Sequence, residues 1–310
     1  MSDFKVHYLG VGSATPSLRH QPSCQVIDFR GRLYMIDCGE GAQLSMRRMS
    51  LKFSRLEHIF ISHLHGDHFF GLPGLLSTLA LHDKGGKVTV HLPEQGVKWL
   101  KETMDMFCRE RPYELEIKAI PAEGGVLLEE KALTVEAFPL QHRVACTGFI
   151  FREAQKPRHL RGDMIKWLQI PISKLKAIKD GADYTTPDGK VYSNEKLTTA
   201  ADPASSYAYC SDTIYMPELY KRLQGIDVVY HEATYLDTER EKAKARFHST
   251  AAEATRVAAA AGAKRLVMGH YSKAYPGLSG HIEEAEKEAL KLGAELMEII
   301  AADEGMTINL

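Results

Sequence analysis

The chain has 310 residues, 44% of them hydrophobic, which is enough to bury one large core with room for an inserted unit. Its formal net charge of −1 excludes a protein that attracts polyanions over its whole surface, so affinity for nucleic acid would have to come from a local basic patch. The five cysteines are odd in number and form no Cys-x-x-Cys pair, which argues against a disulfide framework and a thiolate zinc site and indicates a reducing compartment.

The N-terminus and the hydropathy of the chain indicate a cytoplasmic protein. The first residues enter a strand pattern without a basic and apolar leader, so no secretory signal is predicted. No run of about eighteen consecutive apolar residues occurs, so no membrane-spanning helix is predicted either. We therefore expect a cytoplasmic protein without a membrane partner.

The first half of the chain alternates strand patterns with single helical patterns. The short link Arg30-Gly31-Arg32 favours a hairpin between two strands. The pattern predicts an α/β fold with much antiparallel pairing. Strands are expected at 5–9, 24–29, 33–37, 59–61, 88–92, 113–120, 133–138 and 147–151, and helices at 42–49, 72–82 and 94–107.

The segment 152–205, called the arm below, departs from this alternation. Seven basic residues and one acid, Asp163, lie between Lys156 and Lys179. Short amphipathic runs and turn chemistry at 187–189 indicate a protruding arm, and the alternative is an ordinary solvated loop with lysine-rich helix faces. After the arm, strands are expected at 207–211, 228–230, 265–268, 296–300 and 306–308, and helices at 216–223, 249–262 and 282–292.

Side chains that can bind metal begin directly after the apolar strand 59–61, at His63, His65, Asp67 and His68. Because residues two apart in an extended segment point the same way, His63 and His65 can reach one ion. Gly66 permits a sharp turn, beyond which Asp67 and His68 point elsewhere and suit a second ion. The pattern predicts the first half of a two-metal site.

Three later strand patterns also end at a residue that can bind metal, namely His142, Asp212 and His270. Loops at the strand ends of an α/β fold bring distant residues together, so these ends could converge with residues 63–68 on one site. A lone histidine or aspartate at a strand end is also commonly a hydrogen-bonded structural residue. The joint occurrence with the cluster at 63–68 favours ligation.

Together these motifs resemble the metallo-β-lactamase superfamily, whose signature is His-x-His-x-Asp-His followed by His, Asp and His on later strand ends. Within it the chain resembles the ribonuclease Z family of tRNA 3′-processing endonucleases over essentially its whole length. That second resemblance depends on His-Glu-Ala-Thr at 231–234, His-Ser-Thr at 248–250 and the position of the arm. The other matching segments are 10–16, 37–43, 60–68, 71–74, 139–142, 211–213 and 269–270.

The resemblance implies a four-layer αββα metallo-β-lactamase sandwich, a single domain over residues 1–310, with the basic arm inserted at 152–205. It also implies two zinc ions per chain, bridged by Asp212. The ligand set contains only nitrogen and oxygen donors, which suits Zn²⁺ and tolerates other divalent ions. The implied ligands are His63, His65 and His142 for one ion, and Asp67, His68 and His270 for the other.

The implied reaction is direct hydrolysis of a tRNA precursor 3′ of the discriminator nucleotide, which leaves a tRNA 3′-hydroxyl and a 5′-phosphorylated trailer. Asp67 resembles the family's proton acceptor. His248, held by Glu232, resembles the donor of a proton to the departing oxygen. The alternative for His248 is a residue that merely precedes the helix N-cap at Ser249 or Thr250. His231 is expected to be structural.

The resemblance further implies that the arm binds precursor tRNA and that the protein is a homodimer. The arm departs from the usual family pattern, because its segment 169–173 lacks a Gly-Pro dipeptide. Two other functions remain open: another hydrolase of the superfamily, such as a small phosphodiesterase, thioesterase or lactonase, and a non-catalytic RNA-binding protein with a structural metal. The candidate RNA-binding residues are the basic side chains Arg158, Arg161, Lys166, Lys174, Lys176 and Lys179.

Overall fold

The computed structural model describes residues 3–82 and 84–310, which form two compact units. The larger unit is built from the described residues up to 129, from 134–151 and from 206–310. The smaller unit is built from 130–133 and from the whole arm, 152–205.

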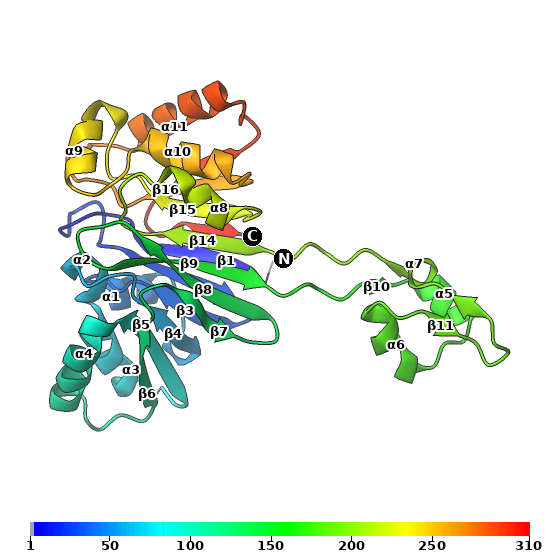
Figure 1. Ribbon diagram of the computed structural model, residues 1–310. Helices are drawn as coiled ribbons and strands as arrows, with labels where there is room; N and C mark the ends of the chain where they lie inside the picture. Colours follow the sequence, from blue (N-terminus) through cyan, green and yellow to red (C-terminus); the bar gives the residue numbers. More distant parts are fainter. Residues whose placement is uncertain (1–2, 83) are drawn as a thin grey trace. The chain divides into compact units, whose positions relative to one another are not determined.

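Two seven-stranded sheets form the centre of the larger unit (Figure 1). The first contains β1 (Phe4–Gly10), β2 (Cys24–Phe29), β3 (Arg32–Ile36), β4 (Leu56–Phe60), β5 (Lys87–Pro93), β6 (Glu114–Ile120) and β18 (Thr307–Asn309), in the order β18-β1-β2-β3-β4-β5-β6. The second contains β7 (Gly125–Glu129), β8 (Leu133–Leu140), β9 (Cys146–Glu153), β14 (Ser206–Cys210), β15 (Val228–Glu232), β16 (Arg265–Gly269) and β17 (Glu298–Ala301), in the order β17-β16-β15-β14-β9-β8-β7.

Helices cover the outer face of each sheet, which gives the α/β sandwich that the resemblance implies. In Figure 1, α1 (Ala42–Arg48), α3 (Leu72–Leu81) and α4 (Glu94–Phe107) lie beside the first sheet. The other sheet is flanked by α8 (Tyr220–Leu223), α10 (Ala251–Ala260) and α11 (Ser279–Leu292). The leucines of α3 at positions 72, 75, 76 and 79 are buried, because this spacing places them on one face of a helix.

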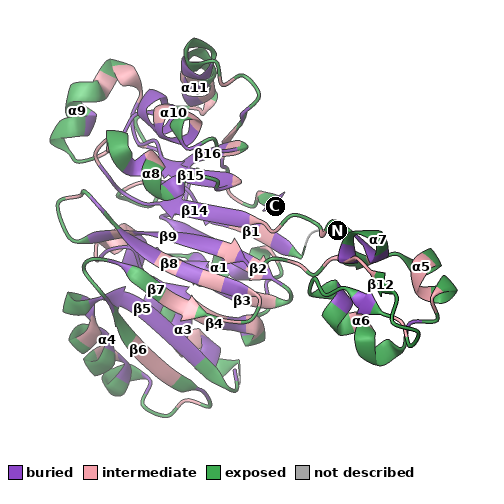
Figure 2. Cartoon of the chain, turned by 45° about the vertical axis from the view of Figure 1, so that its right-hand side comes forward, coloured by how far each residue is buried: buried purple, intermediate pink, exposed green. Residues whose placement is uncertain are grey.

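Aromatic side chains fill the space between the two sheets. Tyr8 of β1 stacks on Tyr230 of β15 with ring centroids 6.1 Å apart. Phe60 of β4 contacts Phe149 and Phe151 of β9 at 5.6 and 5.5 Å. Figure 2 shows the result, with buried residues concentrated in the strands and exposed residues on the helices. Strands covered on both faces, such as β14, are buried at every position, so they read as continuous apolar runs.

The pairing is more parallel than the sequence predicts. Strands β1, β2 and β3 pair antiparallel, as expected for the hairpin at Gly31. From β3 to β6 the strands are parallel, and so are β14 to β17. The reason is that a helix occupies each connection between β3 and β6 and returns the chain to the same end of the sheet. Parallel order brings the carboxyl ends of these strands to one edge.

Most predicted elements are confirmed, with small differences at their ends. The helix predicted at 249–262 is α10, which begins after the N-cap Thr250 and carries a capping box with Glu253. The helix predicted at 282–292 begins earlier, at Ser279. The helix predicted at 216–223 divides into the 3-10 turn η2 (Pro217–Leu219) and α8. Strand β7 was not predicted, because this edge strand is largely exposed and lacks a clear apolar alternation.

The smaller unit has an apolar cluster of its own. Its centre consists of Ile170, Ile178, Tyr184 and Leu197. The side-chain amide of Asn194 donates to the carbonyls of Ile178 and Ala182 at 2.6 and 2.9 Å, which ties its segments together. Its elements are β10 (His159–Leu160), α5 (Gly162–Trp167), α6 (Ile172–Lys179), β11 (Tyr184–Thr185), β12 (Val191–Tyr192), α7 (Asn194–Leu197) and β13 (Thr198–Thr199).

Within residues 3–82 and 84–310, every helix is too short or too polar to span a bilayer.

Candidate metal centre and active site

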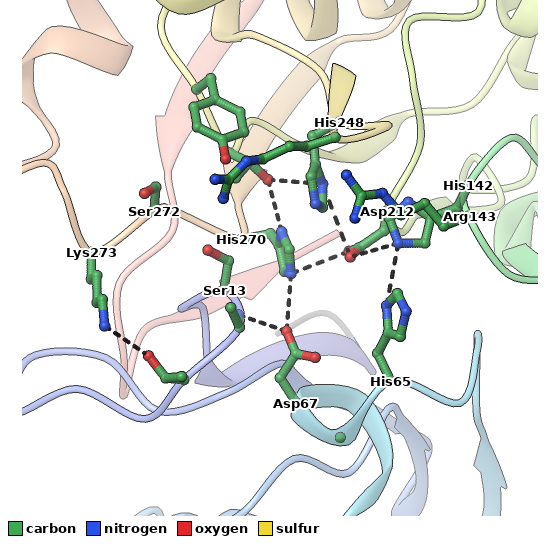
Figure 3. A pocket seen from close by; sticks show the side chains of 16 residues that line it. Ser13, His65, Asp67, His142, Arg143, Asp212, His248, His270, Ser272 and Lys273 are labelled. Carbon is green, nitrogen blue, oxygen red and sulfur yellow. Dashed lines mark hydrogen bonds and ion pairs between the residues drawn. The ribbon is translucent and has the colours of Figure 1, made fainter. Parts of the chain in front are cut away.

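The strand ends singled out in the sequence converge in the larger unit (Figure 3). The loop after β4 supplies His63 and His65, and the short helix α2 (Gly66–Phe69) that follows supplies Asp67 and His68. The loops after β8, β14 and β16 supply His142, Asp212 and His270. The seven residues form two groups whose potential ligand atoms lie within 4.8 Å of one another: His63, His65, His142 and Asp212, and Asp67, His68 and His270.

In the first group, ring nitrogens and a carboxylate oxygen surround a small space. His65 Nδ1 lies 3.1 Å from His63 Nε2 and 3.3 Å from His142 Nε2. Asp212 Oδ2 lies 3.7 Å from His63 Nε2 and 3.8 Å from His142 Nε2. Three imidazole nitrogens and one carboxylate oxygen therefore face a common point.

The second group is built around the other oxygen of the same aspartate. Asp212 Oδ1 lies 3.2 Å from His270 Nε2 and 3.4 Å from His68 Nε2, which are themselves 3.3 Å apart. Asp67 Oδ2 lies 3.5 Å from His270 Nε2 and 3.6 Å from His68 Nε2. Asp212 thus directs one oxygen to each group, which is the geometry of a bridging ligand.

Hydrogen bonds on the far side of three of the five rings orient these histidines toward the two groups. Three Nδ1–H groups donate outward: His68 to Asp37 Oδ2 at 2.7 Å, His142 to the Phe247 carbonyl at 2.9 Å, and His270 to Thr234 Oγ1 at 2.8 Å. Each Nε2 is then left with a lone pair directed inward.

The residues present fit divalent metal ions. Imidazole nitrogens and carboxylate oxygens face one another here at 3.1 to 3.8 Å, so one cation in each space could be bound by several of these atoms at once. Asp212 Oδ1 is buried and has no hydrogen-bond partner within residues 3–82 and 84–310. A donor set of histidine nitrogens and aspartate oxygens is the kind that binds Zn²⁺ and related ions.

Asp37 is a residue of this site that the sequence reading missed. It follows β3 in a left-handed conformation, with φ at 55°, and is completely buried. Its carboxylate accepts hydrogen bonds from His68, from the Ser62 amide and hydroxyl, and from the Tyr209 hydroxyl at 2.6 Å. The sequence did contain an indication of this role, because Asp37 lies at the end of a predicted strand, before a glycine-rich loop, and the other candidate ligands also follow strand ends. Its contacts make it a residue that orients His68.

Beside the two groups of potential ligands lie His248 and Glu232, which the resemblance implies to be the proton donor and the residue that holds it. His248 Nδ1 lies 3.0 Å from Glu232 Oε1 and 4.0 Å from Asp212 Oδ2. Burial acts to lower the pKa of His248, but the charge and hydrogen bond of Glu232 outweigh it and raise the pKa to about 9. The N-cap of α10 is Thr250, two residues further on, so His248 has no capping role.

His231 lies apart from the ligands. Its ring is fully buried, its Nδ1 donates to the carbonyl of Glu232 at 2.7 Å, and its Nε2 is unpaired among the described residues. It belongs to neither group of potential ligands. Its environment is that of a core residue.

The ligand groups open into a cavity of about 700 Å³. Figure 3 shows Asp67, His65, His142 and His248 directed into it. Its wall also contains polar and cationic residues from four loops: Ser13, Thr15, Arg143, Arg246, Ser272 and Lys273. A cavity of this size can admit a nucleotide-sized group to the ligand cluster.

The six candidate RNA-binding residues lie in the smaller unit. Lys166 is on α5, and Lys174, Lys176 and Lys179 are on α6 with their side chains exposed. Arg161 forms an ion pair with Asp163 at 2.8 Å, and Arg158 Nε donates to Thr198 Oγ1 at 2.7 Å. A hollow of about 710 Å³ gathers five cationic side chains of this unit: Lys131, Lys156, Arg158, Lys176 and Lys179.

The two mixed sheets, their flanking helices and the cluster at the strand ends form a metallo-β-lactamase fold, and the sequence relatives described below make the chain a metal-dependent hydrolase of that superfamily. Residues 197–271 match the family model described as Beta-lactamase superfamily domain, and residues 4–151 match that of Anti-Pycsar protein Apyc1. In fold the chain is similar to human tRNase Z, short form, with a TM-score of 0.68, 24% identity and 98% of each chain covered. It is likewise similar to the metallo-β-lactamase fold protein YhfI from Bacillus subtilis, with a TM-score of 0.69, 14% identity and 98% of each chain covered.

Comparison of sequences identifies the family. The chain is 47% identical to a protein named Ribonuclease Z from Porphyromonas gingivalis, over 100% of both chains. It is 45% identical to a protein of the same name from Parabacteroides distasonis, over 93% of this chain and 95% of the relative. The chain belongs to the ribonuclease Z family, which confirms the resemblance read from its motifs.

Proposed function

We propose that this chain is a zinc-dependent endoribonuclease that cleaves tRNA precursors 3′ of the discriminator nucleotide. The products would be a tRNA with a 3′-hydroxyl and a trailer with a 5′-phosphate. Membership of the ribonuclease Z family supports the substrate. The single structural observation that supports the chemistry is the pair of ligand groups that share Asp212, with the His248–Glu232 pair beside them.

Two zinc ions per chain are part of the proposal. His63, His65 and His142 would hold one ion and Asp67, His68 and His270 the other, with Asp212 shared between them. A pair of bound divalent ions supplies an activated water and neutralises charge on a phosphodiester.

The residues around the ligands have the chemistry for proton transfer. Glu232 is fully buried, and its Oε1 accepts from His248 while its Oε2 accepts from the Thr234 hydroxyl at 2.7 Å. This fixed carboxylate keeps the imidazole of His248 protonated at neutral pH. His248 would give its proton to the departing 3′ oxygen of the tRNA. Asp67, whose Oδ2 accepts from the Ala14 amide at 2.7 Å, would orient the attacking water.

We also propose that the arm binds the precursor tRNA. The cationic hollow of the smaller unit supports this role, because clustered lysine and arginine side chains attract a phosphate backbone. Lys176 and Lys179 contribute to the hollow from one helix, α6. In keeping with the family resemblance, the proposed enzyme is a homodimer that acts in the cytoplasm.

One experiment tests the function directly. Purified protein is incubated with an end-labelled tRNA precursor, with and without a chelator, and the cut is mapped. A single cut next to the discriminator nucleotide that disappears with chelator is the expected result. Hydrolysis of small esters without any RNA cut would refute the substrate, and RNA binding without a cut would refute the enzymatic role.

The metal assignment has a separate test with a matched control. His65→Ala removes a proposed ligand, whereas His82→Ala removes an exposed imidazole at the C-terminus of α3. Plasma spectrometry should find two zinc ions in the wild type and the His82 variant, and fewer in the His65 variant. Full occupancy in the His65 variant would contradict the assignment.

A further inference from the structure

Three cationic side chains around the ligand cluster have no role in the proposed reaction. Arg143, Arg246 and Lys273 line the cavity, and all three are exposed. Their observed contacts are to uncharged oxygens: Arg143 Nη2 donates to the Ala245 carbonyl at 3.1 Å, and Lys273 Nζ donates to Thr15 Oγ1 at 3.4 Å. Among the described residues, none of the three has a carboxylate within ion-pair distance.

Other cations near this site are paired in the ordinary way. Arg240, on the same helix that leads to Arg246, donates two hydrogen bonds of 2.7 Å to Asp237. Arg256 Nε donates to Glu288 at 2.7 Å. Unpaired cations gathered at one cavity are free to bind an anion that enters it, because clustered positive charge attracts an anionic ligand.

In the proposed enzyme, the carboxylates at the floor of the cavity would not neutralise these cations. Asp67 and Asp212 would be outweighed by two divalent ions, so the floor would be positive when the site is loaded. Three further cations at the rim would then oppose each other and the floor. A polynucleotide substrate would bring the complementary negative charge, one for each phosphate.

Two of these cations, Arg143 and Lys273, lie on opposite sides of the ligand cluster. Arg143 lies beside the proton donor, because the loops on this side are joined by the bonds from His142 to the Phe247 carbonyl and from Arg143 to the Ala245 carbonyl. The rings of His142 and His248 are 5.1 Å apart. Figure 3 shows Arg143 next to His142 on this side.

Lys273 lies on the other side of the ligand cluster. It contacts Thr15, and the neighbouring Ala14 amide donates to Asp67 Oδ2 at 2.7 Å. Figure 3 shows Ser13 beside Asp67 and Lys273 farther out on the same side, away from His142 and Arg143. The line from Lys273 to Arg143 therefore passes across the ligand cluster.

From this arrangement we propose that the rim cations bind the phosphates on either side of the scissile one, with Arg143 on the tRNA side and Lys273 on the trailer side. The assignment rests on the proposed function, since His248 protonates the oxygen that stays with the tRNA. The tRNA nucleotide must then lie on the His248 side. The trailer, which leaves in the other direction, passes Lys273.

Trailer length provides the test. A precursor whose trailer is one nucleotide ending in a 3′-hydroxyl has no phosphate beyond the scissile one, whereas a longer trailer has several. Lys273→Ala should lower kcat/KM for the longer trailer roughly ten- to hundredfold and leave the one-nucleotide trailer unchanged, because a lost contact between an ammonium and a phosphate has that size. Arg143→Ala should lower kcat/KM for both substrates by similar factors.

A binding measurement on metal-free protein gives a readout that does not depend on cleavage. The slope of log affinity against log salt concentration should become smaller by about 0.7 for Lys273→Ala with the longer trailer, as for one lost single-strand phosphate contact. Lys273→Arg should restore the slope. Lys98→Ala, which removes an exposed lysine on α4, is the matched control and should change nothing.

The outcomes separate this inference from the proposed function. If the wild type cuts neither precursor, the function itself fails. If the wild type cuts both and Lys273→Ala affects both trailers equally, or affects neither, the assignment of Lys273 to the trailer is wrong. If Arg143→Ala is as active as the wild type on both precursors, the tRNA-side assignment is wrong.

Discussion

Asp37→Asn is the substitution that tests most directly how the fold prepares the metal site. Asp37 is completely buried and accepts hydrogen bonds of 2.6 to 2.9 Å from His68, Tyr209 and two groups of Ser62. Asparagine has the same shape but no charge, and it places an NH₂ group where an acceptor is needed.

The consequence is worked out at His68. In the native protein His68 Nδ1 donates to Asp37 Oδ2, so Nε2 directs a lone pair at Asp212 and His270. When an amide NH₂ faces Nδ1, the favoured tautomer carries its proton on Nε2, and this atom no longer binds a cation. Loss of a partner that orients a ligand lowers metal affinity about 10- to 100-fold, or about 1.4 to 2.7 kcal/mol. The free energy of unfolding of the metal-free protein should fall by about 1.5 to 3 kcal/mol, the value of a hydrogen bond to a charged group.

The assay is competition of each variant with a zinc chelator, combined with urea unfolding of the metal-free proteins. Tyr209→Phe is the control, because it removes one donor to Asp37 and leaves the carboxylate and His68 in contact. It should lose stability while keeping native zinc affinity. If Asp37→Asn binds both zinc ions as tightly as the wild type, the tautomer argument is refuted.

Three further predictions follow from the same structure. Glu232→Gln should reduce turnover at least tenfold and keep both metal ions, as measured by kinetics and plasma spectrometry, because it removes the charge that holds the proton on His248. Burial lowers the folded-state pKa of His91 to about 3 and of His281 to about 4, both from 6.5. As pH decreases, the unfolded chain therefore binds these protons before the folded protein does. The contribution of each histidine to the free energy of unfolding should be full above about pH 6.5 and fall by about 1.4 kcal/mol per pH unit as pH decreases toward 4. Urea unfolding of His281→Phe should show a smaller decrease with pH than the wild type, and an equal decrease would contradict the assignment. Deletion of residues 158–190 should abolish precursor binding but spare hydrolysis of bis-p-nitrophenyl phosphate, and equal loss of both would argue against a binding role for the arm.

The sequence was most informative where chemistry and local periodicity coincide. Helix α3 could be predicted because its leucines recur at the spacing of one helix face. The candidate ligands could be named because each lies shortly after an apolar run that predicts a strand. The family resemblance also joined His248 to Glu232, and the structure measures that pair at 3.0 Å.

Other features could not be predicted from local sequence patterns. Parallel pairing from β3 to β6 depends on which distant strands lie side by side, and no local pattern records that. Asp37 reads in sequence as part of a glycine-containing loop, and only its four buried hydrogen bonds identify it as the partner of His68. Charge counting found the arm but overlooked Arg143, Arg246 and Lys273, since single cations far apart in sequence produce no charge run.

The sequence by itself determined the residue types of the site, the alternation of strands and helices, and the family, because side-chain chemistry and hydrophobic period are local properties of the chain. Only the tertiary structure decided that Asp212 directs one oxygen to each ligand group, that Asp37 orients His68, and that cations from separate loops surround one cavity. Those facts are distances between residues up to about two hundred positions apart, and such distances exist only once the two sheets have packed.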